Sequence, residues 1–425
     1  MLVKFSVENY LSFKTRATLD MQAGTIKEHE EHVIQPLFNK NYKILKSAAL
    51  YGANSNGKSN FIKAFSFKRD LIINSSKESN TNSKIAVEPF LLSEETENEP
   101  SVFETVFFLE DIRYKYGFTV TADFVESEWL IQMMKTKEES IFIRHRKEYV
   151  YEKKFKSEFK NQLELLTKVT RDNALFISVL AQFNIAIGIA INEWFSKILV
   201  ATDEDLSTLY NTTANLLKKD TYRELLNKMI VHSGVGIEGI EEKTTGILER
   251  SLYSKESLKN AFDDDFNMLK IRTKHTKFDK DKKPVGIVFF EMDKHESSGT
   301  QKFFSLLGPI LIALHEGRVF FIDELDSRLH SLLFKIIVEF FNSKKYNSGG
   351  AQLIFTSHNT FLLKENKLRR DQMILVNKDE FGVSALASLY ALKPTVRNDA
   401  SFEKDYLKGL YGAIPSITTH QLKLF

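Results

Sequence analysis

The chain has 425 residues, 27% of them charged and 43% hydrophobic, and its 59 Lys and Arg against 56 Asp and Glu leave a formal net charge of +3. This length predicts either one large α/β domain with an inserted lobe or two domains. The absence of cysteine excludes a disulfide scaffold, a thiolate metal site and a cysteine nucleophile. The chain start lacks the pattern of a secretory signal, and the apolar run at 185–191 is far shorter than the roughly 20 residues of a membrane span. We therefore expect a cytoplasmic protein with no membrane partner.

The first third of the chain has mostly strand-like patterns. Alternating apolar residues in 3–7 predict a half-buried strand. An apolar run at 48–51, a glycine-rich turn and helical spacing over 60–67 predict a strand, a loop and a helix in succession. Residues 70–100 are rich in polar side chains and are expected to form a surface excursion. The segments 102–109 and 113–120 predict a hairpin, and the strand-like pattern continues to about residue 151.

The middle of the chain changes to a helical period, from residue 153 to about residue 266. Its heptads are short and interrupted by glycines, which argues against a long coiled-coil arm. A charged loop at 274–283 is expected to close this region.

The last third contains apolar runs at 285–290, 319–322, 353–355 and 373–376, separated by helical segments. This alternation is typical of buried sheet strands with covering helices. We therefore expect an α/β head whose N-terminal lobe, 1–152, and C-terminal lobe, 285–425, are separated by a helical insertion at 153–284.

A phosphate-binding loop is indicated by the sequence GANSNGKS at 52–59, which matches the whole P-loop pattern between a strand and a helix. Inward-turned backbone N–H groups and the helix N-terminus would hold phosphate oxygens. Lys58 would reach the outer phosphates, and the Ser59 hydroxyl would ligate Mg²⁺. We assign the nucleotide contacts to Gly52, Asn54, Asn56, Gly57, Lys58 and Ser59, and the predicted cofactors are ATP and Mg²⁺.

Two later strands end in residues suited to phosphoryl transfer. The apolar run 319–322 is followed by Asp323, which would hold the water shell of the metal, and by Glu324, which would orient and deprotonate the attacking water. The apolar run 353–355 leads to His358, which could contact the γ-phosphate. Strand ends with acids or a histidine are common, but their order after a P-loop favours a catalytic interpretation.

A third element lies just before the acidic strand. The sequence SSGTQ at 297–301 precedes a helix, and its Ser298, Gly299 and Gln301 could place a second helix N-terminus on a γ-phosphate. An ordinary Ser/Gly helix cap is the alternative. The segment LDSRLH at 325–330 directly follows the two acids.

In chain order the five elements are the P-loop, the segment 297–301, the two acids, the segment 325–330 and His358. In this order they resemble the ABC-type heads of SMC, Rad50 and RecF proteins over residues 1–150 and 285–425. The opening VENYLSF at 7–13 is similar to the start of that family. Residues 399–406 and 412–415 resemble the ending of RloA-like bacterial ATPases from abortive-infection and anti-phage defence loci, a group related to proteins of the overcoming-lysogenization-defect type.

The resemblance implies a P-loop ABC-type head, ATP hydrolysis and a homodimer or higher homo-oligomer in which each P-loop faces the signature of another subunit. It also implies a separately encoded effector, such as a toprim nuclease of the RloB-like kind. The chain carries no fused toprim domain, so we expect it not to cut nucleic acid itself. The glutamine that links Mg²⁺ to the insertion in this family has no clear match, and Gln132 is the candidate.

Three function classes remain open: a defence ATPase that controls an effector, an SMC- or RecF-like ATPase that acts directly on DNA, and a scaffold that uses ATP only for assembly. Basic clusters at 144–147, 153–154 and 280–283 are interleaved with Phe and Tyr and could follow a phosphate backbone, although such clusters usually form solvated faces. Glu324 argues against a non-hydrolytic scaffold, and the large insertion argues against a transporter subunit. We expect the first class.

Overall fold

The computed structural model describes residues 1–36, 42–77, 83–134, 137–202, 205–242, 270–392, 396 and 400–411. The chain forms two compact units. The first comprises Met1–Val200, Leu314–Leu325 and Val338–Phe425, and the second comprises Ala201–Ala313 and Asp326–Ile337. The predicted boundaries at 152/153 and 284/285 remain a prediction. The compact units divide the chain elsewhere, since the helices up to Val200 belong to the first unit.

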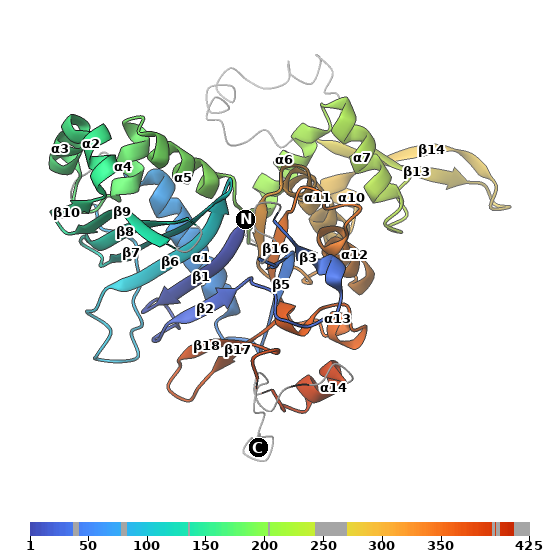
Figure 1. Ribbon diagram of the computed structural model, residues 1–425. Helices are drawn as coiled ribbons and strands as arrows, with labels where there is room; N and C mark the ends of the chain where they lie inside the picture. The colour runs from blue at the N-terminus through green and yellow to red at the C-terminus, as the bar shows by residue number, and fades with distance from the viewer. Residues whose placement is uncertain are drawn as a thin grey trace, which may run out of the picture. The chain divides into compact units, whose positions relative to one another are not determined.

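The first unit contains an antiparallel sheet of seven strands in the order β10-β9-β8-β7-β6-β1-β2. The predicted hairpin at 102–120 is confirmed as β6 and β7, paired from Ser101↔Val120 to Leu109↔Ile112. The strands are β1 (Leu2–Glu8), β2 (Ala17–Asp20), β6 (Ser101–Leu109), β7 (Ile112–Val120), β8 (Val125–Met134), β9 (Lys137–His145) and β10 (Glu148–Tyr151). Four helices lie together beside this sheet (Figure 1), namely α2 (Lys153–Glu158), α3 (Lys160–Val169), α4 (Phe176–Gln182) and α5 (Ala186–Ser196).

A second sheet has the order β11-β15-β16-β5-β17-β18. Strands β15, β16, β5 and β17 run parallel, and β18 pairs antiparallel with β17. Parallel strands covered on both faces are continuously apolar, as in β5 and β15, whose residues are all buried. The strands are β11 (Leu199–Ala201), β15 (Val319–Ile322), β16 (Gln352–Ser357), β5 (Ser47–Tyr51), β17 (Met373–Lys378) and β18 (Ser384–Ser388).

The helix after β5, α1 (Lys58–Asn74), connects the cores of these two sheets. Phe65 of α1 stacks on Phe321 of β15 with ring centroids 4.0 Å apart, and it also contacts Phe5 of β1 edge-on at 5.0 Å. Phe61 contacts the same Phe5 ring at 5.1 Å. The sequence therefore buries its phosphate-site helix between a parallel and an antiparallel layer. The remaining short elements of this unit are β3 (Val33–Ile34), β4 (Ile44–Leu45), η1 (Glu30–His32), η4 (Arg370–Gln372), α13 (Phe361–Lys364) and α14 (Phe402–Leu407).

The second unit contains helices and a small antiparallel sheet of order β12-β13-β14. Thr213 of α6 donates to the carbonyl oxygen of Ser305 in α11 at 2.9 Å. The strands are β12 (Gly239–Glu242), β13 (Ile271–Phe278) and β14 (Pro284–Glu291). The helices α6 (Leu206–Leu216), α7 (Asp220–Val231) and α10 (Met292–His295) lie in this unit, whereas α11 (Ser298–Glu316) and α12 (Ser331–Asn342) each continue into the first.

Three local expectations were wrong. The segment 274–283 is not a closing loop but most of β13 and the turn to β14. The run 285–290 is not a buried strand, because every residue of β14 is exposed or half-buried. The segment 70–100 is not wholly a surface excursion, since α1 extends to Asn74 and Phe90 is 1% exposed. Residues 243–269 of the expected insertion lie outside the described residues.

The apolar run at 185–191 falls at the start of α5. Among the residues that the structure describes, no single helix is long and apolar enough to cross a membrane, and only α4 and α5 together, bent by 107°, pass that test of length and composition.

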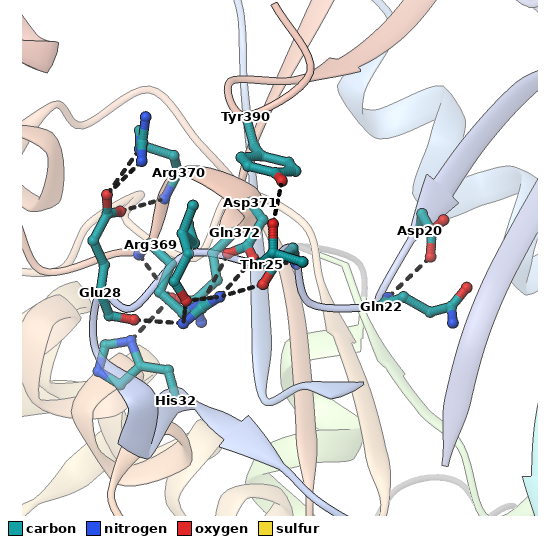
Figure 2. Close-up of polar contacts among 12 residues, drawn as sticks. Asp20, Gln22, Thr25, Glu28, His32, Arg369, Arg370, Asp371, Gln372 and Tyr390 are labelled. Atoms are coloured by element: carbon teal, nitrogen blue, oxygen red, sulfur yellow. Dashed lines mark hydrogen bonds and ion pairs between the residues drawn. The ribbon is translucent and has the colours of Figure 1, made fainter. Parts of the chain in front are cut away.

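A buried polar network fastens the segment 24–32 to the chain just before β17 (Figure 2). Arg369, 1% exposed, binds the Asp371 carboxylate with two hydrogen bonds of 2.9 and 2.8 Å. Gln372 links His32, at 2.9 Å, to the Ser47 hydroxyl at the start of β5, at 2.8 Å. Burial lowers the pKa of His32 from its ordinary 6.5 to about 4. The strands β5 and β17, which flank the phosphate loop, are therefore anchored at their beginnings by side-chain hydrogen bonds.

Candidate nucleotide-binding site

The loop between β5 and α1 has the conformation of a phosphate cradle. Gly57 has φ 102° at the N-cap of α1, a left-handed conformation that favours glycine. A Cβ atom on Gly52 would collide with the carbonyl oxygen of Val376 in β17. Asn56 donates from Nδ2 to the same carbonyl oxygen at 2.9 Å. Gly52 is therefore required by the close approach of the Val376 backbone and Gly57 by its left-handed conformation, and the predicted strand–loop–helix context is confirmed.

Lys58 projects into this loop from the first residue of α1. Its side chain is buried, and Nζ donates to the carbonyl oxygens of Gly52 at 2.8 Å and of Ala53 at 2.9 Å. The ammonium group is thus held inside the ring of loop backbone, beside the N-terminus of a 17-residue helix. The positive charge of Lys58 and the helix N-terminus together make this a candidate anion site.

The two acids after β15 are positioned by one threonine of β16. The hydroxyl of Thr356 donates to Asp323 Oδ1 at 2.6 Å and accepts from the backbone N–H of Glu324 at 2.7 Å. Glu324 has φ 45°, an uncommon value for a residue other than glycine. This left-handed turn directs the chain so that Glu324 lines the cavity at the phosphate loop.

A cavity of about 270 Å³ brings most of the predicted residues of the first unit together, whereas Gly52, Asn56 and Asp323 are not among its lining residues. Its lining combines loop and helix residues around the phosphate site with one acid and one histidine from two neighbouring strand ends. The lining residues are Asn54, Ser55, Gly57, Lys58, Ser59, Asn60, Glu324 and His358. Carboxyl ends of parallel strands meet at one edge of a sheet, where ligands of such folds bind. A cation, a hydroxyl, a carboxylate and an imidazole therefore converge where a phosphate chain would lie.

The signature residues lie in the second unit, at the start of α11. Ser298 is exposed, and Gln301 donates from Nε2 to the carbonyl oxygen of Glu296 at 2.9 Å. The Ser297 hydroxyl accepts from the backbone N–H of Thr300 at 3.1 Å, so the helix-cap interpretation of this segment is confirmed locally. A Cβ atom on Gly299 would collide with the carbonyl oxygen of Arg328. Gly299 thus has a packing role within the chain, and its contact with a nucleotide remains a prediction.

Two groups of residues escaped the sequence analysis. Thr356 sits in an apolar strand, and a hydroxyl one residue before Ser357 carries no motif of its own. Ser12 and Ser384 brace the loop: Ser384 donates to the carbonyl oxygen of Asn56 at 2.7 Å, and Asn60 donates to Ser12 Oγ at 2.9 Å. These contacts join positions 48 and 328 residues apart, and no local pattern marks them.

Two further predictions are placed away from the cavity. Gln132 lies in β8, opposite Tyr114 and Glu139, and is not among the cavity-lining residues. The basic cluster at 144–147 is not a continuous solvated face, because Arg144 is fully buried and donates to the carbonyl oxygen of Ala174 at 2.7 Å. Arg144 is therefore unsuited to contact a phosphate backbone.

Residues 47–364 match the family described as "AAA domain, putative AbiEii toxin, Type IV TA system". The chain belongs to this family. No curated protein matches the chain. The family match covers the phosphate loop, both acids, the signature segment and His358, so the mixed α/β fold with its parallel sheet is that of an AAA-type P-loop domain. Membership in the narrower RloA-like group stays a prediction, and its supporting residues 412–415 lie outside the described part of the chain.

Proposed function

We propose that this chain is a Mg²⁺-dependent ATPase that regulates a separately encoded effector in a bacterial anti-phage, abortive-infection system. In this proposal the AAA-type domain is an ABC-type head split by the helical region, and ATP drives the association of two such heads. The observation that carries the ATPase part is the convergence of Lys58, Glu324 and His358 on one cavity at the phosphate loop.

The roles of the residues follow from their positions. Lys58 and the loop N–H groups would bind the β- and γ-phosphates. Ser59 and Asp323 would hold Mg²⁺, which when bound offsets the negative charge of the phosphates. Thr356 keeps the Asp323 carboxylate in place through its 2.6 Å hydrogen bond.

Glu324 and His358 line the same cavity as the start of α1. Glu324 would orient the attacking water and accept its proton, and His358 would contact the γ-phosphate. Phosphoryl transfer depends mainly on positioning and charge stabilisation, and the strand ends of a buried parallel sheet are rigid supports for both.

Head association is supported by the placement of the signature. Ser298 is exposed at the first residue of α11, a helix of 19 residues that begins in the second compact unit. A second chain that supplied this helix start would add partial positive charge to the γ-phosphate. ATP would contact both chains only in their associated state and would bind that state more tightly, so it would shift the equilibrium toward association.

The regulatory part of the proposal is supported by the family description, which names a toxin of a type IV toxin–antitoxin system, and by the RloA-like resemblance of the C-terminal residues. An effector such as a toprim nuclease would bind to, or be released by, the associated state of the two heads.

The test is ATP turnover measured with three variants. Lys58→Ala should lose nucleotide binding, because the loop loses its buried cation. Glu324→Gln should bind ATP but hydrolyse it more slowly by about two to four orders of magnitude, since general-base catalysis contributes that much. Undiminished turnover in Glu324→Gln would assign the base elsewhere.

The third variant, Ser298→Glu, tests sharing of the site. It is preferable to a Gly299 substitution, because any side chain at Gly299 would clash with Arg328 within the same chain. Ser298→Glu should bind ATP normally but fail to associate and hydrolyse, and mixing it with Lys58→Ala should recover at most one working site per pair. Full activity of Ser298→Glu would exclude the shared site. Phage plaquing with and without the neighbouring gene then tests the effector, and protection by this chain alone would contradict the two-component proposal.

The alternative, an SMC- or RecF-like ATPase that acts directly on DNA, is favoured by one surface feature. The turn between β13 and β14 carries exposed lysines at 280, 282 and 283. Stimulation of turnover by DNA, lost when these lysines are replaced by glutamine, would favour this alternative.

A further inference from the structure

Two histidines and a glutamate gather on one short turn of the first unit. His29, Glu31 and His32 lie at the turn η1, and each offers one nitrogen or oxygen atom within 4.8 Å of the atoms offered by the other two. Residues three apart eclipse one another along a 3₁₀-helix. The rings of His29 and His32 accordingly stack, with their centroids 4.7 Å apart. Side chains of a type that binds metal ions are therefore brought together by local backbone geometry.

A hydrogen bond fixes which ring nitrogen of His32 is free. Its Nδ1 lies 2.9 Å from Gln372 Oε1 (Figure 2). That amide oxygen also accepts from the backbone N–H of Arg369 at 3.0 Å, and the amide nitrogen of Gln372 donates to the Ser47 hydroxyl. An amide oxygen can only accept, so Nδ1 of His32 carries the ring proton. Nε2 of the neutral ring therefore keeps its lone pair.

The same reasoning applies to His29. Its Nε2 lies 3.0 Å from the backbone carbonyl oxygen of Asn366. A carbonyl oxygen can only accept, so in the neutral ring Nε2 carries the proton and Nδ1 keeps its lone pair. A histidine that binds a metal ion through one nitrogen almost always donates from the other nitrogen to such an outer oxygen. Both histidines have this outer hydrogen bond.

The two free nitrogens face one carboxylate oxygen. Glu31 Oε1 lies 3.5 Å from His29 Nδ1 and 3.5 Å from His32 Nε2. Both distances exceed the range of about 2.7–3.2 Å of a usual N–H···O hydrogen bond. They are close to the spacing of about 3.3 Å between two ligands of a tetrahedral ion whose bonds are about 2.0–2.1 Å long. Three acceptor atoms at this spacing repel one another unless a cation lies between them.

The ligand types select the class of ion. Two imidazole nitrogens and one carboxylate suit a divalent transition-metal ion such as Zn²⁺, whereas Mg²⁺ and Ca²⁺ prefer oxygen ligands. The side chains of His29 and Glu31 are 31% and 49% exposed, so an ion can enter from the solvent. A water molecule would complete a four-coordinate site.

Binding requires one of the two rings to turn. The ring planes are now within 9° of parallel, whereas a bound ion lies near the plane of each imidazole that holds it. His32 is 10% exposed and is held by Gln372, so the more exposed His29 is the ring that has room to turn. The ion would then fix the orientation of the His29 ring.

We propose that His29, Glu31 and His32 bind a divalent transition-metal ion of the Zn²⁺ class. This site is separate from the candidate nucleotide site. Gln372 connects it to Ser47 at the start of β5, whereas the phosphate loop follows the other end of that strand, roughly 13 Å along it. The ion and a proton would compete for Nε2 of His32, so the protonation of this ring is a property of the metal-free chain.

The first test is Zn²⁺ binding by the full chain after its metal has been removed with a chelator. Calorimetry without nucleotide should show one strong site per chain. Zn²⁺ should raise the melting temperature and Mg²⁺ at the same concentration should not, because an ion that binds only the folded chain stabilises it. Co²⁺ in place of Zn²⁺ should give the intense visible absorption of a four-coordinate ion. A wild-type chain that takes up no Zn²⁺ would overturn the proposal.

The second test removes the two exposed ligands one at a time. Glu31→Gln and His29→Ala leave the buried His32 and its hydrogen bond to Gln372 in place, so both variants should fold. Each should weaken Zn²⁺ binding at least tenfold, because even the loss of an outer hydrogen-bond partner of a ligand typically costs about 10–100-fold. Wild-type Zn²⁺ affinity in either variant would contradict the proposal.

Two controls complete this test. Glu30→Gln neutralises an exposed carboxylate on the same turn and should bind Zn²⁺ as the wild type does. An equal loss in Glu30→Gln would show that the ion is held by general negative charge rather than by the three named ligands. Lys58→Ala should also bind Zn²⁺ normally, so a failure of the ATPase proposal would leave this result unaffected.

Discussion

Strands β15 and β14 have similar apolar sequences, VFFI and PVGIVFFE, but occupy opposite environments. All four residues of β15 are buried, whereas β14 is mostly exposed. The first lies inside a parallel sheet next to β16, and the second lies at the edge of a small antiparallel sheet. An apolar run thus predicts a strand but not its burial, because burial is decided by the layers that pack on it.

The difference has a functional meaning. Burial on both faces holds Asp323 and Glu324 rigidly at the end of β15, as a catalytic site needs. Among the described residues β14 has a neighbouring strand on one side only, and its side chains are exposed or half-buried. One apolar sequence therefore positions the two acids of the candidate site, and the other forms the edge of a small sheet.

The largest expected effect is on the free energy of unfolding, when a side chain of β15 and a side chain of β14 are each truncated to alanine. Phe321→Ala should lower the free energy of unfolding by about 3–5 kcal/mol, because a buried Phe leaves a cavity when truncated and loses its stacking on Phe65. Ile287→Ala should change it by less than about 0.5 kcal/mol, as expected of an exposed site. Urea unfolding of both variants, at a concentration low enough to keep the chains apart, checks the pair. Similar losses in both would show that β14 is covered within its own chain.

A smaller effect on the free energy of unfolding comes from protonation of the buried His32. The unfolded chain binds a proton at His32 near pH 6.5, whereas the folded chain does so only near pH 4. The contribution of neutral His32 to the free energy of unfolding is therefore fully present above pH 6.5. It falls by about 2–3 kcal/mol as the pH decreases toward 4. Thermal unfolding between pH 7 and 5 should show a shallower slope in His32→Gln. The exposed His232→Gln is the control, and a wild-type slope in both variants would refute the assignment.

The smallest effect concerns one hydroxyl. Thr356→Val removes the link between Asp323 and the Glu324 backbone, and it should cost about 1–3 kcal/mol because a partly buried N–H loses its partner. ATP turnover should fall with it. The control is Thr105→Val, a fully buried threonine whose hydroxyl has no hydrogen-bond partner among the described residues and whose loss should be neutral or stabilising. Unchanged turnover in Thr356→Val would show that Asp323 needs no such support.

Local chemistry determined the phosphate site. A P-loop needs consecutive residues of defined type, so GANSNGKS predicted its loop, its helix and its lysine directly. The two acids and His358 were also predictable, because each directly follows an apolar strand and parallel strands end at the same edge.

Only the tertiary structure decided the rest. The hydrogen bonds of Thr356, Ser12 and Ser384 join residues from 32 to 328 positions apart, and no spacing rule in the sequence predicts them. The network of Arg369, Asp371 and Gln372 with the segment 24–32 is long-range for the same reason. The sequence placed Arg144 in a basic cluster that was expected to be exposed. The side chain is instead buried and donates to a backbone carbonyl oxygen of a distant segment.

The sequence by itself therefore determined where the phosphate-type loop and its lysine lie, because that information is contained in short stretches of backbone conformation and side-chain type. The tertiary structure decided which apolar strand is core and which is edge, and which charges are buried. Those outcomes depend on how much surface each neighbouring layer removes from water, and that quantity is a property of the packed chain rather than of any one segment.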